Sequence, residues 1–257
     1  MTSRLLRWLG EALGLRRRTF PAATEAGEVL YAIGDVHGRA DLLQALFRQI
    51  DADQARLADT DCTEIILGDL IDRGPESRAV VDLVLARRAS GHRVVVLKGN
   101  HEEMLLRFLS DPAALKGWRK RGGYPTLMSF GVAPPGFLDA AAAKACRRAF
   151  REALGPVHLA FFEGLDFSYS TGGYFFAHAG VDPARPLHDQ LEKDLISIRE
   201  PFLDHRESFG KIVVHGHTPC RQPEFRPHRI NIDTGAYATG VLTCLVLDGA
   251  SHRLLQT

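Results

Sequence analysis

The chain has 257 residues, of which 45% are hydrophobic and 25% charged, a composition that fits an ordinary globular protein and excludes a disordered or fibrous one. Its formal net charge of +1 excludes the strong positive field that attracts nucleic acid, so no nucleic-acid partner is expected. The four cysteines are scattered and form no CxxC pair, which favours a reducing, cytoplasmic location.

Residues 1–28 are interpreted as a basic, amphipathic extension. Leu5, Trp8 and Leu9 can share much of one helical face, opposite the arginines. Because charged residues interrupt the apolar ones, the segment lacks the core of a secretory signal, and no apolar run in the chain is long enough to span a bilayer. We expect the extension to pack on its own domain or to end as a frayed tail. Peripheral contact with a membrane surface or a partner is the alternative.

From residue 29 onward, short apolar runs alternate with segments of helical periodicity. The runs predict buried strands, and the periodic segments between them predict helices. Such an alternation is typical of parallel βαβ units, whose functional sites lie beyond the carboxyl ends of the strands. The first predicted strands are residues 29–33, 64–68 and 93–99, and the helices between them are residues 40–50 and 77–89.

Residues 109–165 have a different character. Glycine and proline interrupt this segment around alanine-rich pieces such as "DAAAAKACRRAFREAL", which predicts a helical insertion. Strand patterns return after it, and there is no internal repeat or low-complexity linker, so residues 29–257 are expected to form one domain. The later predicted strands are residues 173–178, 211–216, 229–233 and 242–248.

Polar side chains that can bind metal follow five of these strands, at the point where each strand ends. Carboxylate, imidazole and amide oxygen are ligands of divalent ions such as Mn²⁺, Fe²⁺ and Zn²⁺. A single Gly-Asp after a strand is ordinary turn chemistry. Compatible ligands at five strand ends of one sheet edge indicate a metal site. The five segments are Gly34-Asp35-Val36-His37-Gly38, Gly68-Asp69-Leu70-Ile71-Asp72-Arg73-Gly74, Gly99-Asn100-His101-Glu102, His178-Ala179-Gly180 and His215-Gly216-His217-Thr218.

In this order the five segments match the motifs GDxHG, GDxxDRG, GNHE, HAG and GHT. The chain therefore resembles the calcineurin-like metallophosphoesterases, and within them the bacterial serine/threonine phosphoprotein phosphatases, over about residues 29–248. The resemblance implies an α/β fold, a β-sandwich of two mixed sheets flanked by helices (α/β/β/α), with residues 109–165 as a helical insertion over the site. The paired GDxxDRG and GNHE motifs carry most of its specificity.

The resemblance also implies two divalent metal ions, with Mn²⁺ expected first and Fe²⁺ or Zn²⁺ as alternatives. Two cations that share a carboxylate can lower the pKa of a bridging water, and the resulting hydroxide attacks phosphorus directly. His215 precedes the GHT motif and is left out of the ligand set. In the implied set, Asp35 and His37 hold one ion, Asp69 bridges to the second, and Asn100, His178 and His217 complete the second.

By the same resemblance, His101 is the general acid that protonates the leaving oxygen, and Asp72 orients and charges it. Arg73 is expected to bind two phosphate oxygens at once, a geometry that lysine cannot copy. Arg199, in the looser segment "LISIREPFL", is expected to add a second phosphate contact. No cysteine or serine nucleophile is required.

One departure from the wider family bears on the substrate. Many metallophosphoesterases read G-H-x-H, whereas Pro219 stands in the position of the last histidine. This favours the protein phosphatase branch over the nuclease and cyclic phosphodiesterase branches. The expected substrate is phosphoserine or phosphothreonine in a protein, with phosphotyrosine as an alternative, or a small phosphoester. The alternative is hydrolysis of a dinucleoside polyphosphate such as diadenosine tetraphosphate, because those enzymes share the metal motifs. A catalytically dead module that binds phosphorylated proteins is a further alternative, against which the complete set of ligands and the acid argues.

Overall fold

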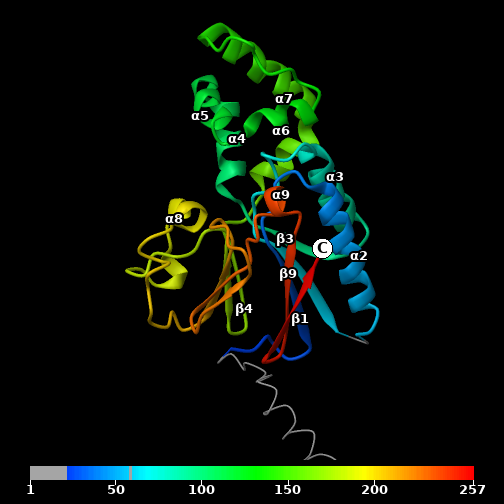
Figure 1. Cartoon of the computed structure of the whole chain (residues 1–257), viewed down its shortest axis with the longest axis vertical. Coiled ribbons are helices and arrows are strands. Elements are labelled where there is room, and N and C mark those ends of the chain that lie inside the picture. The colour runs from blue at the N-terminus through cyan, green and yellow to red at the C-terminus, as the bar shows by residue number, and fades with distance from the viewer. Residues whose placement is uncertain (1–21, 58–59) are drawn as a thin grey trace, which may run out of the picture.

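The chain folds as two five-stranded β-sheets packed face to face, with helices on their outer sides (Figure 1). The structure, a computed structural model, describes residues 22–57 and 60–257. The helix predicted within residues 1–28 therefore falls almost entirely outside the described residues. The α/β/β/α architecture that the resemblance implied is confirmed.

The strands are β1 (Glu28–Ile33), β2 (Asp61–Ile66), β3 (Arg93–Val96), β4 (Ser168–Thr171), β5 (Tyr174–Ala177), β6 (Ile212–His215), β7 (Glu224–Phe225), β8 (Arg229–Asn231), β9 (Thr243–Asp248) and β10 (Ser251–Gln256). The helices are α2 (Ala40–Gln54), α3 (Ser77–Ala89), α4 (Asn100–Ser110), α5 (Leu115–Arg119), α6 (Gly123–Ser129), α7 (Ala140–Glu163), α8 (Glu192–Ser197) and α9 (Ala236–Thr239), with 3-10 turns η1 (Pro112–Ala114) and η2 (Leu187–Asp189).

Both sheets are mixed. The first has the strand order β10-β9-β1-β2-β3, in which β1, β2 and β3 are parallel and β9 and β10 are antiparallel to their neighbours. The second has the order β4-β5-β6-β8-β7, with β5, β6 and β8 parallel and antiparallel strands at both edges. In each sheet the parallel strands end at one common edge, where a site can be assembled from several loops.

Alternation along β1 divides its side chains between two cores. Leu30 and Ala32 lie between the sheets, in a core that also holds Phe176 of β5. Tyr31 and Ile33 belong to the core that the first sheet shares with the helices. Because successive side chains of a strand point to opposite faces, a strand covered on both sides has to be apolar throughout. This accounts for the uninterrupted apolar run of β1.

Helices α4 to α7 stand together beyond the sheets, at the top of the view in Figure 1. Trp118 of α5 packs against Phe108 of α4 and Phe150 of α7, with ring centroids 5.3 and 5.8 Å apart. All three rings are buried. Burial of each such side chain contributes roughly 2 kcal/mol, so this aromatic cluster holds the helical arm together.

Each predicted strand and each of the two predicted helices is present, but the pattern missed three strands. These are β4, β7 and β10, and all three lie at sheet edges. An edge strand is half exposed and carries polar residues, so its sequence has little apolar periodicity to detect. Residues 109–165 do hold α5, α6 and α7, but helix α4 begins earlier, at Asn100.

No helix within residues 22–57 and 60–257 is long and apolar enough to cross a membrane. The cysteines are free thiols, and burial raises the pKa of each, which is the opposite of what a nucleophilic cysteine requires. That no cysteine acts as a nucleophile stays an expectation. The cytoplasmic location stays a prediction.

Candidate metal centre

The loops after β1, β2 and β3 meet because glycine packs against glycine. A Cβ atom on Gly68 would lie 2.6 Å from the Gly99 nitrogen, which is closer than real Cβ atoms approach. The φ angle of Gly68 is +100°, a region that side chains with a Cβ avoid. The GD motif after β2 and the GN motif after β3 can therefore touch only if both carry glycine, and this contact places Asp69 beside Asn100.

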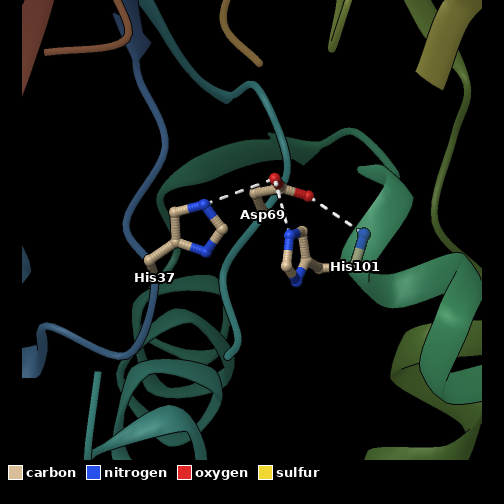
Figure 2. Close-up of side chains that lie close together, drawn as sticks. All are labelled: His37, Asp69 and His101. Carbon is tan, nitrogen blue, oxygen red and sulfur yellow. Dashed lines mark hydrogen bonds and ion pairs between the residues drawn. The ribbon is translucent and has the colours of Figure 1, made fainter. Parts of the chain in front are cut away.

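Asp69 lies at the centre of the site. One carboxylate oxygen, Oδ2, is 3.4 Å from Nε2 of His37 and 3.8 Å from Nε2 of His101. Figure 2 shows both rings directed at this carboxylate. The other oxygen, Oδ1, is 3.5 Å from Nε2 of His178. Two groups of ligand atoms result, each with its atoms within 4.8 Å of one another, and Asp69 belongs to both. The first group is His37, Asp69 and His101. The second group is Asp69, His178 and His217.

The second group includes an amide oxygen. Nε2 of His178 lies 3.3 Å from Oδ1 of Asn100 and 3.2 Å from Nδ1 of His217. Four of the residues assigned to the second ion by resemblance therefore converge on one point. Nitrogen and oxygen donors without thiolate form a set that suits Mn²⁺, Fe²⁺ or Zn²⁺.

Backbone carbonyls fix the orientation of two histidines. Nδ1 of His37 lies 2.8 Å from the oxygen of Ile71, and Nδ1 of His178 lies 2.9 Å from the oxygen of Leu67. When each Nδ1–H donates to its carbonyl, the Nε2 lone pair faces Asp69. Histidines that bind metal are held in this way by a partner on the far ring nitrogen.

Asp35 is buried beside the second group and lies outside both groups of ligand atoms defined above. Its carboxylate accepts a hydrogen bond from the backbone nitrogen of His217 at 3.1 Å. Burial and the negative charges of Asp233 and Asp69 raise the pKa of Asp35. Burial, with the charge of Asp69, also raises the pKa of Asp233, to about 6. Buried carboxylates this crowded are stabilised in their charged form by a divalent cation, so the donor set fits metal ions.

The backbone is strained at the predicted site residues. Within residues 22–57 and 60–257, five residues other than glycine have a positive φ angle, and all five carry side chains of the site. A non-glycine residue in this region costs of order 1 kcal/mol, so the surrounding contacts have to hold it there. The five are His37 (46°), Asp69 (48°), Asp72 (71°), Arg73 (66°) and His217 (64°).

The predicted acid and its partner lie together. Nδ1 of His101 donates to Oδ2 of Asp72 at 2.6 Å. Asp72 is fully buried and also accepts from Nε1 of Trp118 at 2.7 Å and Oγ1 of Thr126 at 2.6 Å. Burial alone would lower the pKa of His101, but the charges of Asp69 and Asp72 and the hydrogen bond outweigh it and raise that pKa above 6.5. His101 therefore holds its proton more readily than a free histidine.

Two arginines flank the metal groups. Nη2 of Arg73 lies 3.5 Å from Nε2 of His101, and its guanidinium lies over the ring of Tyr237. Arg199 is exposed, and its Nη2 donates to the backbone oxygen of His217 at 3.4 Å. Both cations therefore contact residues of the two metal groups, His101 and His217.

His215, which was left out of the ligand set, lies outside both groups. Its Nδ1 is 3.1 Å from the oxygen of Gly216, and its Nε2 is 3.4 Å from Nη1 of Arg229. Burial lowers the pKa of His215 to about 3, with the charge of Arg229 as the next cause. The ring is therefore neutral, and its contacts are with the neighbouring residue Gly216 and with Arg229 of β8.

The structure adds Glu102, to which the motifs assigned no role. Its Oε2 accepts hydrogen bonds from the backbone nitrogens of Asp69 at 2.9 Å and Gly99 at 2.8 Å, and its Oε1 accepts from Leu70 at 2.8 Å. Glu102 thus ties the loop after β2 to the start of α4. The E of GNHE was the available signal, since a buried glutamate needs such partners.

Tyr237, Trp118 and Thr126 were also missed as site residues. Trp118 and Thr126 are 46 and 54 positions from Asp72 in the chain. No local pattern links them to the GDxxDRG motif. Their segment, "GWRKRGGYPTLMSFG", was noted only for its likeness to the family.

The family description "calcineurin-like phosphoesterase" matches residues 29–239, from β1 to α9. The chain is 32% identical over 161 residues to the symmetrical bis(5'-nucleosyl)-tetraphosphatase of Cellvibrio japonicus. This match covers 63% of this chain and 48% of the relative. The chain is also 28% identical over 239 residues to the asymmetrical bis(5'-nucleosyl)-tetraphosphatase PrpE of Geobacillus thermodenitrificans. That match covers 83% of this chain and 88% of the relative. The chain thus spans about half the length of the first relative and most of the second.

Among solved structures, a protein serine/threonine phosphatase from Saccharomyces cerevisiae superposes with a TM-score of 0.55. The sequences are 14% identical, and the match covers 90% of this chain and 80% of that chain. At this identity the likeness is one of fold.

Proposed function

The chain belongs to the calcineurin-like phosphoesterase family, and on that premise we propose that it is a two-metal hydrolase of dinucleoside polyphosphates such as diadenosine tetraphosphate. The observation that carries the chemistry is the position of Asp69, whose two carboxylate oxygens face separate histidine groups. The names of the two curated relatives, both bis(5'-nucleosyl)-tetraphosphatases, support the substrate. This replaces the phosphoprotein reading as the first candidate.

Asp69 is proposed as the ligand common to both ions. Two divalent ions, Mn²⁺ first and Fe²⁺ or Zn²⁺ as alternatives, would supply charge neutralisation and a water of lowered pKa at such a site. The proposed ligands are Asp35, His37, Asp69, Asn100, His178 and His217.

The remaining site residues are proposed to bind the phosphate and to protonate the leaving oxygen. Arg73 is proposed to bind two phosphoryl oxygens in a bidentate way, and Arg199, which donates to the backbone oxygen of His217, is proposed to add a second positive charge. His101 gives its proton to the oxygen that leaves when the P–O bond breaks, and Asp72 holds the ring in the orientation that this transfer needs. Trp118 and Thr126 donate hydrogen bonds to Asp72, so the buried side chain of Asp72 has its hydrogen bonds satisfied and is held in a fixed position.

Dephosphorylation of phosphoserine or phosphothreonine in proteins is the second candidate. The observation that favours it is Pro219, an exposed proline in the position where nucleases and cyclic phosphodiesterases of the superfamily carry a histidine ligand. The same machinery would serve both reactions, since in each water attacks a phosphorus and the P–O bond to the leaving group breaks.

A substrate panel with metal analysis tests the proposal. Purified protein loaded with Mn²⁺ is assayed on diadenosine tetraphosphate, a phosphoserine peptide and para-nitrophenyl phosphate, and bound metal is counted by mass spectrometry. We expect about two ions per chain and the highest kcat/KM on the dinucleotide. A higher kcat/KM on the phosphopeptide would reverse the order of the two candidates, and absence of bound metal would overturn both.

A further inference from the structure

A groove of about 1020 Å³ opens beside the metal groups, between the helical arm and the loop after α8. Asn100 and His217 line one end of it, so the groove begins at the proposed second ion. Helix α4 runs along it from Asn100, and Asp111 just beyond the helix lines its far part; at 1.5 Å per residue the two are about 16 Å apart. A single phosphate at the metal groups would leave most of this length unused.

The groove is strongly basic although the chain as a whole has a net charge of only +1. Five of its lining residues are cations and one, Asp111, is an acid. Within residues 22–57 and 60–257, none of the five cations forms an ion pair. A concave surface with unpaired charges of one sign concentrates ligands of the opposite sign. The cations are Arg107, Lys116, Lys120, Arg121 and Arg199.

The positions of these cations indicate an extended ligand. Arg107 is seven residues beyond Asn100 along α4, about 10 Å further from the metal groups. Lys116, Lys120 and Arg121 line the same groove from the segment after α4, and all of them are exposed. Several exposed cations along one groove suit a chain of phosphates, because such a chain presents negative charge along its length without a fixed planar geometry.

We propose that Arg107, Lys116, Lys120 and Arg121 form a subsite for the phosphates of a polyphosphate chain that are not being hydrolysed. This inference rests on the proposed function and deepens it: the residues select substrates by the length of the phosphate chain. Arg199 stands at the junction of the groove and the metal groups. Two exposed contacts between a cation and a phosphate together change the affinity for the ligand by about tenfold, and the effect weakens as the salt concentration rises.

The experiment compares two double variants. Lys116→Gln/Arg121→Gln removes two charges from the groove. Arg148→Gln/Arg151→Gln removes two exposed charges from α7, where both residues line a different depression. The first readout is the ratio of kcat/KM on diadenosine tetraphosphate to kcat/KM on para-nitrophenyl phosphate. We expect it to fall about tenfold in the groove variant and to stay unchanged in the α7 variant.

The second readout does not depend on cleavage of a dinucleotide. Linear tripolyphosphate and orthophosphate are compared as inhibitors of aryl phosphate hydrolysis at a fixed excess of free Mn²⁺. We expect tripolyphosphate to inhibit the wild type far more strongly than orthophosphate, and the groove variant to lose about tenfold of that preference. Chelation of Mn²⁺ would affect both double variants equally, so the α7 variant controls for it. Melting temperature and metal content confirm that each variant is folded and loaded.

Each result has a distinct meaning. If the dinucleotide is not cleaved but the groove variant loses the tripolyphosphate preference, the proposed substrate is wrong and the subsite stands. If the dinucleotide is cleaved and both readouts are the same in the two variants, the subsite is overturned and the proposed function stands. If the groove variant instead loses activity only on an acidic phosphopeptide, the groove binds peptide, and the polyphosphate assignment is overturned.

Discussion

The guanidinium of Arg73 lies over the ring of Tyr237, with Arg73 Cζ 4.6 Å from the ring centroid. The same ring meets His37 edge to face, with centroids 5.4 Å apart. Tyr237 belongs to the short helix α9 after the "NIDTG" segment and is 39% exposed, so it lies at the surface of the site. The tyrosine thus restrains the arginine that is proposed to bind the phosphate.

Replacing Tyr237 with leucine is expected to raise KM about two- to fivefold, because the cation–π contact that orders Arg73 is lost. Tyr237→Phe keeps the ring and is expected to retain the KM of the wild type. Steady-state kinetics on para-nitrophenyl phosphate measure both. A large fall of kcat in the phenylalanine variant would show that the hydroxyl takes part in the reaction, contrary to a purely positioning role.

His101→Ala is expected to lower kcat on the order of 10²- to 10⁴-fold on a phosphoserine peptide, because a serine alkoxide leaves poorly without a proton. The loss should be much smaller on an aryl phosphate, whose leaving group is a weak base. Metal content should remain as in the wild type. Since His101 Nε2 lies 3.8 Å from Asp69, loss of metal would show instead that His101 is a ligand.

Asp69→Asn is expected to reduce the number of bound ions below two and to abolish most turnover, because one neutral amide cannot replace a carboxylate shared by two cations. Metal titration followed by mass spectrometry measures the stoichiometry. Asp204→Asn, at an exposed position on the surface, is the matched control. Full activity in the Asp69 variant would rule out the bridge.

Glu102→Gln is expected to destabilise the fold by about 2 kcal/mol. A glutamine has one acceptor oxygen, so at least one of the backbone N–H groups of Asp69, Leu70 and Gly99 would be left buried without a partner. The neighbouring Glu103→Gln changes a side chain that is 47% exposed and should have little effect. Urea unfolding of the metal-free variants measures the difference. Equal urea midpoints for the Glu102→Gln and Glu103→Gln variants would show that the hydrogen bonds of Glu102 do not stabilise the site.

His228→Phe is expected to flatten the pH dependence of stability. His228 is 5% exposed, and neither ring nitrogen has a hydrogen-bond partner among the described residues. Burial lowers its pKa in the fold, with the charges of Arg229 and His205 as further causes. The unfolded chain therefore binds the proton more readily, and stability is lost as the pH falls below about 6.5.

The measurement for His228 is the melting temperature at pH 8 and at pH 5. A difference of one bound proton between the unfolded and folded chain changes the free energy of unfolding by about 1.4 kcal/mol per pH unit, so the wild type should lose more stability than the phenylalanine variant. Burial likewise lowers the pKa of His215 to about 3, so part of the acid sensitivity will remain in the variant. An unchanged difference between the two pH values would show that His228 is charged in the fold.

Much of the architecture could be predicted because its signals are local. The apolar run of β1 and the amphipathic pattern of α2 follow from burial on two faces or on one, and each can be read within a few residues. The edge strand β10 could not be predicted, because none of its side chains is buried and its sequence has no regular apolar alternation. Its pairing is with β9, and it is the turn at Gly249 (φ +54°) that brings the two strands together.

The site divides in the same way. Each of the motifs around Asp35, Asp69 and Asn100 is a short run of consecutive residues. The residue types that can bind metal could therefore be identified before the fold was known. The partners of Asp72 could not, because Trp118 and Thr126 belong to the helical arm, 46 and 54 positions further along the chain.

By itself the sequence determined which side chains are able to bind metal and phosphate and which strands deliver them, since both depend on residue type and short-range pattern. Only the tertiary structure decided that the two oxygens of Asp69 face different histidines and that Glu102 joins the two loops. It also decided that unpaired cations of the helical arm line one groove beside the site. The reason is physical: distances between atoms far apart in the chain are set by packing of the sheets and the arm, which no local pattern encodes.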